Sequence, residues 1–204
     1  MSVQANARTL RLVAVARYLA MGVALLSATL AAQAADAAAG ERKAAACAAC
    51  HGVDGHSAMV ETPSLAGQPA AYLARQLRLF RDGQRPSPIM TPLAGGLSDA
   101  DIDDLAAGYA ALAPRPSGAP DEPAVATGRR VAESRFCASC HQPDFAGNGA
   151  YPRLAGQRAD YLTKSLRDFR DGRRSADDPM MNEVVQGMSD ADLVALASFL
   201  SQLP

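Results

Sequence analysis

The chain has 204 residues, of which 49% are hydrophobic but only 5% aromatic, and its formal net charge is −1. This balance of charge argues against nucleic acid as a partner. Much of the hydrophobic content is alanine, so large apolar side chains are sparse, and we expect another bulky apolar group to fill the centre of the fold.

Residues 1–34 have the pattern of a secretory signal peptide. Arg8, Arg11 and Arg17 precede an apolar run, and Ala32-Gln33-Ala34 forms a small-x-small cleavage site. The run is short for a membrane span, so we expect cleavage at its end and export to the periplasm; a retained anchor is the alternative. Cleavage would remove three basic and no acidic residues, leaving 17 basic against 21 acidic residues and a charge of −4.

The rest of the chain contains one sequence pattern twice. Cys47-Ala-Ala-Cys50-His51 recurs 90 residues later as Cys137-Ala-Ser-Cys140-His141. Three further segments match between the copies: 63–68 with 152–157, 72–83 with 161–172, and 97–102 with 188–193. This repetition predicts two similar domains, 35–112 and 125–204. The segment between them, 113–124, has four prolines and is expected to be an extended linker.

Each copy is predicted to be helical. The alanine-rich segment 41–49 favours a helix before the first cysteine pair. Apolar residues at helical spacing follow in 72–80 and 161–169, and a glycine stands where each helix would end. Ser98 and Ser189 each precede an aspartate by three positions, which is typical of the start of a helix. No convincing strand pattern is present, so the fold class is all-α.

The Cys-x-x-Cys-His units indicate covalent haem. Two cysteines three positions apart lie on one face of a helical turn and can bond the two vinyl groups of one haem, with the histidine placed against the iron. A zinc site would not explain a histidine after both pairs, and a thioredoxin-like redox pair needs a βαβ context that is missing. Disulfides within such short loops would be strained. We therefore expect two haem c groups, attached through the sulfurs of Cys47, Cys50, Cys137 and Cys140.

The iron ligands follow from the same comparison of copies. His51 and His141 are the expected proximal ligands, and a methionine sulfur is a common sixth ligand. Met90 and Met181 each stand eight residues before the serine that starts the last helix of their copy. We therefore assign these two methionines to iron.

Two other methionines near Met181 receive different interpretations. Met180 aligns with Ile89 and Met188 aligns with Leu97, so both occupy positions that an ordinary hydrophobic residue fills in the first copy. We expect Met180 to flank the ligand and Met188 to pack in the core. The loop before the ligand is two residues longer in the second copy, so Met180 stays an alternative ligand.

These motifs together resemble the dihaem cytochrome c4 family. Each Cys-x-x-Cys-His unit is followed by Pro-x-Leu-Ala-Gly-Gln, Tyr-Leu, Phe-x-x-Gly and a methionine before Leu-Ser-Asp or its equivalent. The resemblance implies two tandem class I cytochrome c domains related by pseudo-twofold symmetry, each wrapped around one covalent haem, with the haem propionate edges facing each other. It also implies that the carbonyl groups of Pro63 and Pro152 hold the proximal histidines.

The resemblance and the expected ligands predict function. If both irons carry histidine and methionine, neither has an open position for a substrate, so the protein is expected to be a periplasmic electron carrier and not an enzyme. It would take single electrons from a quinol-oxidising complex or a dehydrogenase and pass them to a terminal oxidase. The segments between each histidine and the following proline differ, so the two reduction potentials are expected to differ.

Two alternatives remain at this point. One is a dihaem subunit of a flavoprotein dehydrogenase of the sulfide dehydrogenase type. The other is a dihaem peroxidase, which would need a displaceable sixth ligand and is disfavoured by the matching methionines. Neither nucleic acid nor a small-molecule substrate is expected as a partner, and the protein is expected to be soluble or peripheral at the membrane surface.

Overall fold

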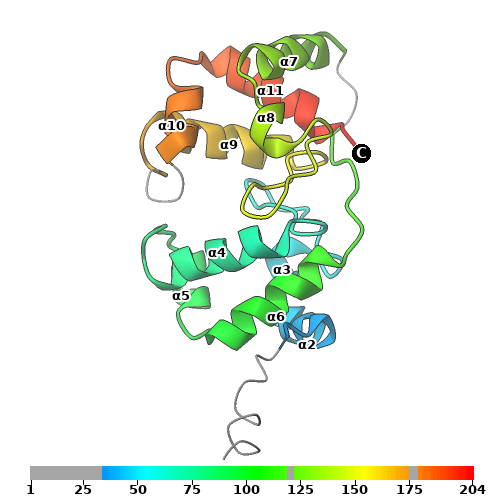
Figure 1. Ribbon diagram of the computed structural model, residues 1–204, viewed down its shortest axis with the longest axis vertical. Helices are drawn as coiled ribbons and strands as arrows, with labels where there is room; N and C mark the ends of the chain where they lie inside the picture. The colour runs from blue at the N-terminus through cyan, green and yellow to red at the C-terminus, as the bar shows by residue number, and fades with distance from the viewer. Residues whose placement is uncertain (1–33, 119–121, 175–178) are drawn as a thin grey trace, which may run out of the picture. The chain divides into compact units, whose positions relative to one another are not determined.

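The computed structural model describes residues 34–118, 122–174 and 179–204. The predicted signal peptide therefore lies outside the described residues except for Ala34, as does part of the predicted linker. Residues 35–204 form one compact unit. Its regular elements in these ranges are helices, apart from an isolated β-bridge between Asn148 and Tyr151, so the predicted all-α class is confirmed (Figure 1).

The two repeats contain corresponding helices. In chain order the elements are α2 (Ala37–Lys43), the 3-10 helix η1 (Ala44–Ala46), α3 (Ala48–His51), α4 (Ala70–Arg81), α5 (Met90–Ala94), α6 (Asp99–Ala110), α7 (Glu122–Ser134), α8 (Ala138–His141), α9 (Ala159–Arg170), α10 (Pro179–Val185) and α11 (Asp190–Ser201). Figure 1 shows α2 to α6 grouped together and α7 to α11 grouped together. The first repeat thus ends with α6, and the second with α11.

The first and last helices of each repeat cross in close contact through glycine. A Cβ atom on Gly40 of α2 would lie 1.9 Å from the Asp104 carbonyl oxygen of α6. A Cβ atom on Gly128 of α7 would lie 2.0 Å from the Ala195 carbonyl oxygen of α11. Because no side chain fits into such a gap, only glycine lets these backbones approach.

The predicted helix over 41–49 is wrong in its extent. Helical structure begins earlier, at Ala37, and breaks into α2, η1 and α3. Alanine favours helix throughout this segment but does not specify where the axis bends. Lys43 ends α2 and pairs with Asp101 and Asp104 of α6, at 2.7 Å each, and these contacts fix the helix end.

The predicted helix ends and starts elsewhere are confirmed. Helices α4 and α9 both end two residues before a glycine of positive φ, 70° at Gly83 and 71° at Gly172. The Ser98 hydroxyl accepts a hydrogen bond from the Asp101 amide, and the Asp101 carboxylate accepts one from the Ser98 amide, which completes a capping box at α6. Ser189 caps α11 through the Asp192 amide.

The linker differs from its predicted form at its C-terminal end. Helix α7 begins at Glu122, inside the segment predicted as an extended linker, 113–124. Pro123 is the second residue of that helix, where its missing amide hydrogen costs nothing because the first-turn amides have no partner within the helix.

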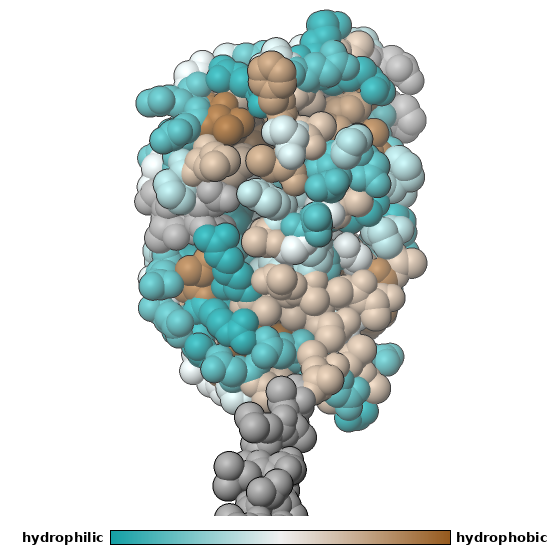
Figure 2. Space-filling view, viewed as in Figure 1, coloured by the Kyte–Doolittle hydropathy of each residue, from teal (hydrophilic) through white to brown (hydrophobic). Residues whose placement is uncertain are grey.

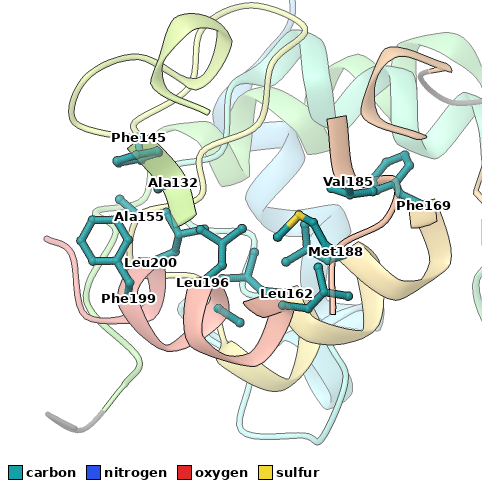
Figure 3. Packing of buried hydrophobic residues seen from close by; sticks show 13 residues of the cluster. Ala132, Phe145, Ala155, Leu162, Phe169, Val185, Met188, Leu196, Phe199 and Leu200 are labelled. Carbon is teal, nitrogen blue, oxygen red and sulfur yellow. The ribbon is translucent and has the colours of Figure 1, made fainter. Parts of the chain in front are cut away.

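The cores are built from the predicted helical stripes. In the second repeat Leu162, Leu196 and Leu200 are buried together with Met188 (Figure 3). The first repeat has a smaller cluster that includes Leu73, Ile102, Leu105 and Tyr109. Within the described ranges, no helix is long and apolar enough to cross a membrane.

Candidate functional site

Each Cys-x-x-Cys-His unit forms one short helical turn. Cys47 is the N-cap of α3 and Cys137 is the N-cap of α8. The His51 amide donates to the Cys47 carbonyl at 3.0 Å, and the His141 amide donates to the Cys137 carbonyl at 3.1 Å. The turn brings two thiols and one imidazole of each repeat to the same cavity. All four cysteines are of intermediate exposure, and none is joined to another in a disulfide.

Each histidine of these units is buried and held by a proline carbonyl. The Nδ1 atom of His51 lies 2.9 Å from the Pro63 oxygen, and that of His141 lies 2.9 Å from the Pro152 oxygen. A carbonyl only accepts, so Nδ1 carries the proton and Nε2 keeps its lone pair for a metal. The role predicted for the two prolines is confirmed by these contacts. Burial lowers the pKa of His51, which favours the neutral, metal-binding form.

One cavity of about 1440 Å³ adjoins both units. This volume exceeds the ~300–1,000 Å³ of an ordinary pocket for one small ligand. Its lining includes both cysteine pairs, both histidines, and Met90 and Met181. Thiols for covalent attachment, imidazoles with a free Nε2, thioether sulfurs and an apolar wall are the groups that a haem requires, so the residues present fit two haems.

The methionines near the end of the chain differ in their surroundings. Met188 is 4% exposed and packs among Leu162 and Leu196, so its predicted core role is confirmed (Figure 3). Met181 is partly buried and lines the cavity, while Met180 also lines it but is 55% exposed. Both stand on α10, a short helix that the sequence interpretation missed, as it missed α5, which begins at Met90.

The internal alignment that selects Met181 has structural support. Arg81 donates to the Leu97 carbonyl in the first repeat, and Arg170 donates to the Met188 carbonyl in the second. Equivalent arginines therefore contact Leu97 and Met188, the two residues that the alignment pairs. The same register pairs Met90 with Met181.

Sequence reasoning missed a cluster of arginine and tyrosine side chains on the cavity wall. Arg85 donates to the Tyr161 hydroxyl at 3.2 Å, and Arg174 donates to the Tyr72 hydroxyl at 3.1 Å, so each arginine reaches a tyrosine of the other repeat. Burial alone would raise the pKa of Tyr161, but the charges of the two arginines lower it. The signal available in the sequence was the matching Gly-x-Arg in both copies, at 83–85 and 172–174.

Two minor features complete the site. His56 does not line the large cavity; its side chain is 11% exposed and lies near Asp54. Among the residues described, no three His, Cys, Asp or Glu side chains form a group suited to a metal ion, so the zinc alternative has no ligand cluster there.

Comparison with known proteins agrees with this geometry. Residues 125–204 match the family described as Cytochrome c, and residues 34–107 match the family described as Cytochrome C oxidase, cbb3-type, subunit III. The chain is 40% identical to cytochrome c4 of Pseudomonas aeruginosa over 185 residues, which cover 85% of this chain and 92% of that protein. It is 38% identical over 196 residues to the thiosulfate dehydrogenase electron acceptor of Thiomonas intermedia, with 90% of each chain covered. The crystal structure of reduced recombinant cytochrome c4 from Pseudomonas stutzeri has a TM-score of 0.79 at 36% identity and covers 84% of this chain and 100% of its own.

Proposed function

This chain belongs to the dihaem cytochrome c4 family, and we propose that it carries single electrons in the periplasm from a quinol-oxidising complex or a dehydrogenase to a terminal oxidase. Members of the family are electron carriers and not enzymes, and they bind two haem c groups. The observation that carries the proposal is one cavity lined by two thiols, one imidazole and the proposed methionine ligand of each repeat.

The side chains of this chain would hold the two haems as follows. Cys47 and Cys50 would bind the first haem through thioether bonds, with His51 and Met90 as its iron ligands. The corresponding residues of the second repeat are Cys137, Cys140, His141 and Met181. Haem iron supplies one-electron redox chemistry, and a methionine ligand raises its potential. With both axial positions taken, neither site would leave room for a substrate.

Other residues would hold the rim of each haem. The guanidinium groups of Arg85 and Arg174 provide positive charge on the cavity wall. They would bind the propionate carboxylates of the haems, because a guanidinium group can donate two parallel hydrogen bonds to one carboxylate. These contacts would lie where the two repeats meet, since each arginine also contacts a tyrosine of the other repeat.

Two measurements test the ligand assignment. The exported holoprotein should have the mass of the chain plus two haems, and a redox titration should show one electron per haem. Met181→Ala should remove the weak red absorption band of iron–sulfur ligation from half of the haem, while Met180→Ala should retain it. The reverse pattern would assign the second iron to Met180, and a mass without two haems would refute the function.

A second candidate donor follows from one relative. Because the Thiomonas intermedia protein is named as the electron acceptor of thiosulfate dehydrogenase, this chain would also suit a sulfur-oxidising dehydrogenase as its upstream partner. Mixing the oxidised holoprotein with that enzyme and thiosulfate distinguishes the cases. Rapid haem reduction supports this dehydrogenase as the donor, and reduction only by a quinol-oxidising complex supports that complex as the donor.

A further inference from the structure

The hydrogen bond that holds His51 involves a peptide group with a second partner. The Pro63 oxygen accepts from His51 Nδ1 at 2.9 Å. The nitrogen of the same peptide group belongs to Ser64, and it donates to Oε1 of Gln157 at 2.8 Å. Gln157 belongs to the second repeat, so one peptide group joins the histidine of the first repeat to a side chain of the other.

The second repeat has the same arrangement with the roles exchanged. The Pro152 oxygen accepts from His141 Nδ1 at 2.9 Å. The Arg153 amide of that peptide group donates to Oε1 of Gln68 at 3.0 Å, and Gln68 belongs to the first repeat. Each repeat therefore supplies the glutamine that contacts the histidine-binding peptide of the other.

Both glutamines are fixed in orientation and shielded from water. Nε2 of Gln157 donates to the Ser64 carbonyl at 2.8 Å, and Nε2 of Gln68 donates to the Arg153 carbonyl at 2.7 Å. If the side-chain amide were reversed, its NH2 group would face a backbone N–H and its oxygen would face a backbone carbonyl. Only one orientation of each glutamine therefore satisfies both contacts. Gln157 is 4% exposed and Gln68 is 6% exposed, which makes these bonds stronger than they would be in water.

The hydrogen bond to Gln157 affects His51 because both side chains bind the same peptide group. When Oε1 accepts the amide hydrogen of Ser64, the peptide group becomes more polarised and its oxygen becomes a better acceptor. The Pro63 oxygen then draws the Nδ1 proton of His51 more strongly, which raises the basicity of the imidazole as a metal ligand. A more basic ligand stabilises ferric iron over ferrous iron and lowers the reduction potential.

We propose that Gln157 is a positioning residue for His51 and that Gln68 is a positioning residue for His141, so that each repeat tunes the reduction potential of the haem in the other. This inference rests on the proposed function, in which the two histidines bind iron.

The test uses Gln157→Leu and Gln68→Leu in the holoprotein, each the matched control for the other because both remove a buried neutral glutamine from the same region. The potential of each haem is measured by redox titration, and the Nδ1 proton of each histidine is followed by NMR. Gln157→Leu should raise the potential of the His51 haem, shift the His51 Nδ1 proton, and leave the His141 haem unchanged. Gln68→Leu should do the opposite.

Other outcomes overturn the proposal. A shift confined to the haem of the mutated repeat, an equal shift at both haems, or no shift would show that the glutamines only hold the fold together. If a leucine variant fails to fold, Gln157→Glu replaces it. Either protonation state of the new side chain leaves an oxygen to accept the Ser64 amide, so the potential of the His51 haem should not rise, and a rise would contradict the proposal.

Failure of this inference is distinguishable from failure of the proposed function. Loss of one or both haems from the unmodified protein would refute the function. Two haems with normal ligation, but with the wrong haem responding to each variant, would refute only the positioning role.

Discussion

Three methionines within nine positions differ in burial, and the roles proposed for them differ accordingly. All three line the large cavity, but Met188 is 4% exposed and packs with leucines of α9 and α11, Met181 is partly buried, and Met180 is 55% exposed. Thioether sulfur is both a good core filler and a good ligand to haem iron, so composition alone does not choose between the two uses.

Substitutions at two of these methionines should have opposite profiles. Met188→Ala should lower the free energy of unfolding by about 2–5 kcal/mol, because it leaves a cavity in a packed core. It should keep the red absorption band, because Met181 and not Met188 is the proposed iron ligand. Met180→Ala should change stability by about 0.5 kcal/mol or less, as expected at an exposed position. Chemical denaturation with visible spectroscopy checks both, and a lost band in Met188→Ala would contradict the core assignment.

At the level of elements, the crossings of first and last helices depend on backbone contact. Gly40 and Gly108 face each other between α2 and α6, where a Cβ on Gly108 would lie 3.1 Å from the Glu41 nitrogen. Helix propensity alone would favour alanine at either position by about 1 kcal/mol. The fold keeps glycine because close packing outweighs propensity here.

Gly40→Ala should therefore destabilise the protein by about 1–3 kcal/mol in spite of the better helix former, because the new methyl group overlaps the Asp104 carbonyl. Gly96→Ala is the matched control: a Cβ there meets nothing within 4 Å, and it should be neutral or slightly stabilising. Thermal unfolding of both holoproteins gives the comparison. Equal stability of the two variants would show that the helices move apart at little cost.

Across residues 35–204, the two repeats share a scaffold but not identical surroundings for their histidines. Tyr151 packs edge-on against His141 with ring centroids 6.4 Å apart, whereas Thr62 holds the equivalent position before Pro63. On the face shown in Figure 2, strongly hydrophobic residues form small separate spots, and a broad area of moderately hydrophobic residues lies in the lower half of the view.

The difference between repeats leads to a test of the two potentials. The holoprotein should show two separate one-electron waves. Tyr151→Thr should lower the potential of the His141 haem, because water admitted near the iron favours the ferric state. Thr62→Tyr should raise the potential of the His51 haem for the converse reason. Spectroelectrochemistry with assignment of each haem measures both. A rise in Tyr151→Thr or a fall in Thr62→Tyr would show that solvent exposure does not set this difference.

The sequence by itself determined the repeat, the haem attachment units, the helix caps and the candidate ligands. Each of these is encoded by residues close together in the chain, where one helical turn or one cap fixes the geometry. Only the tertiary structure decided which residues of one repeat serve the other. Gln157 meets Ser64 across 93 positions and Gln68 meets Arg153 across 85, and no periodicity in the sequence reports a contact over such a separation. These contacts form only when the two repeats pack together. Once buried, a peptide amide without a hydrogen-bond partner would lower the stability of the fold by more than the entropy lost in ordering the glutamine side chain that binds it.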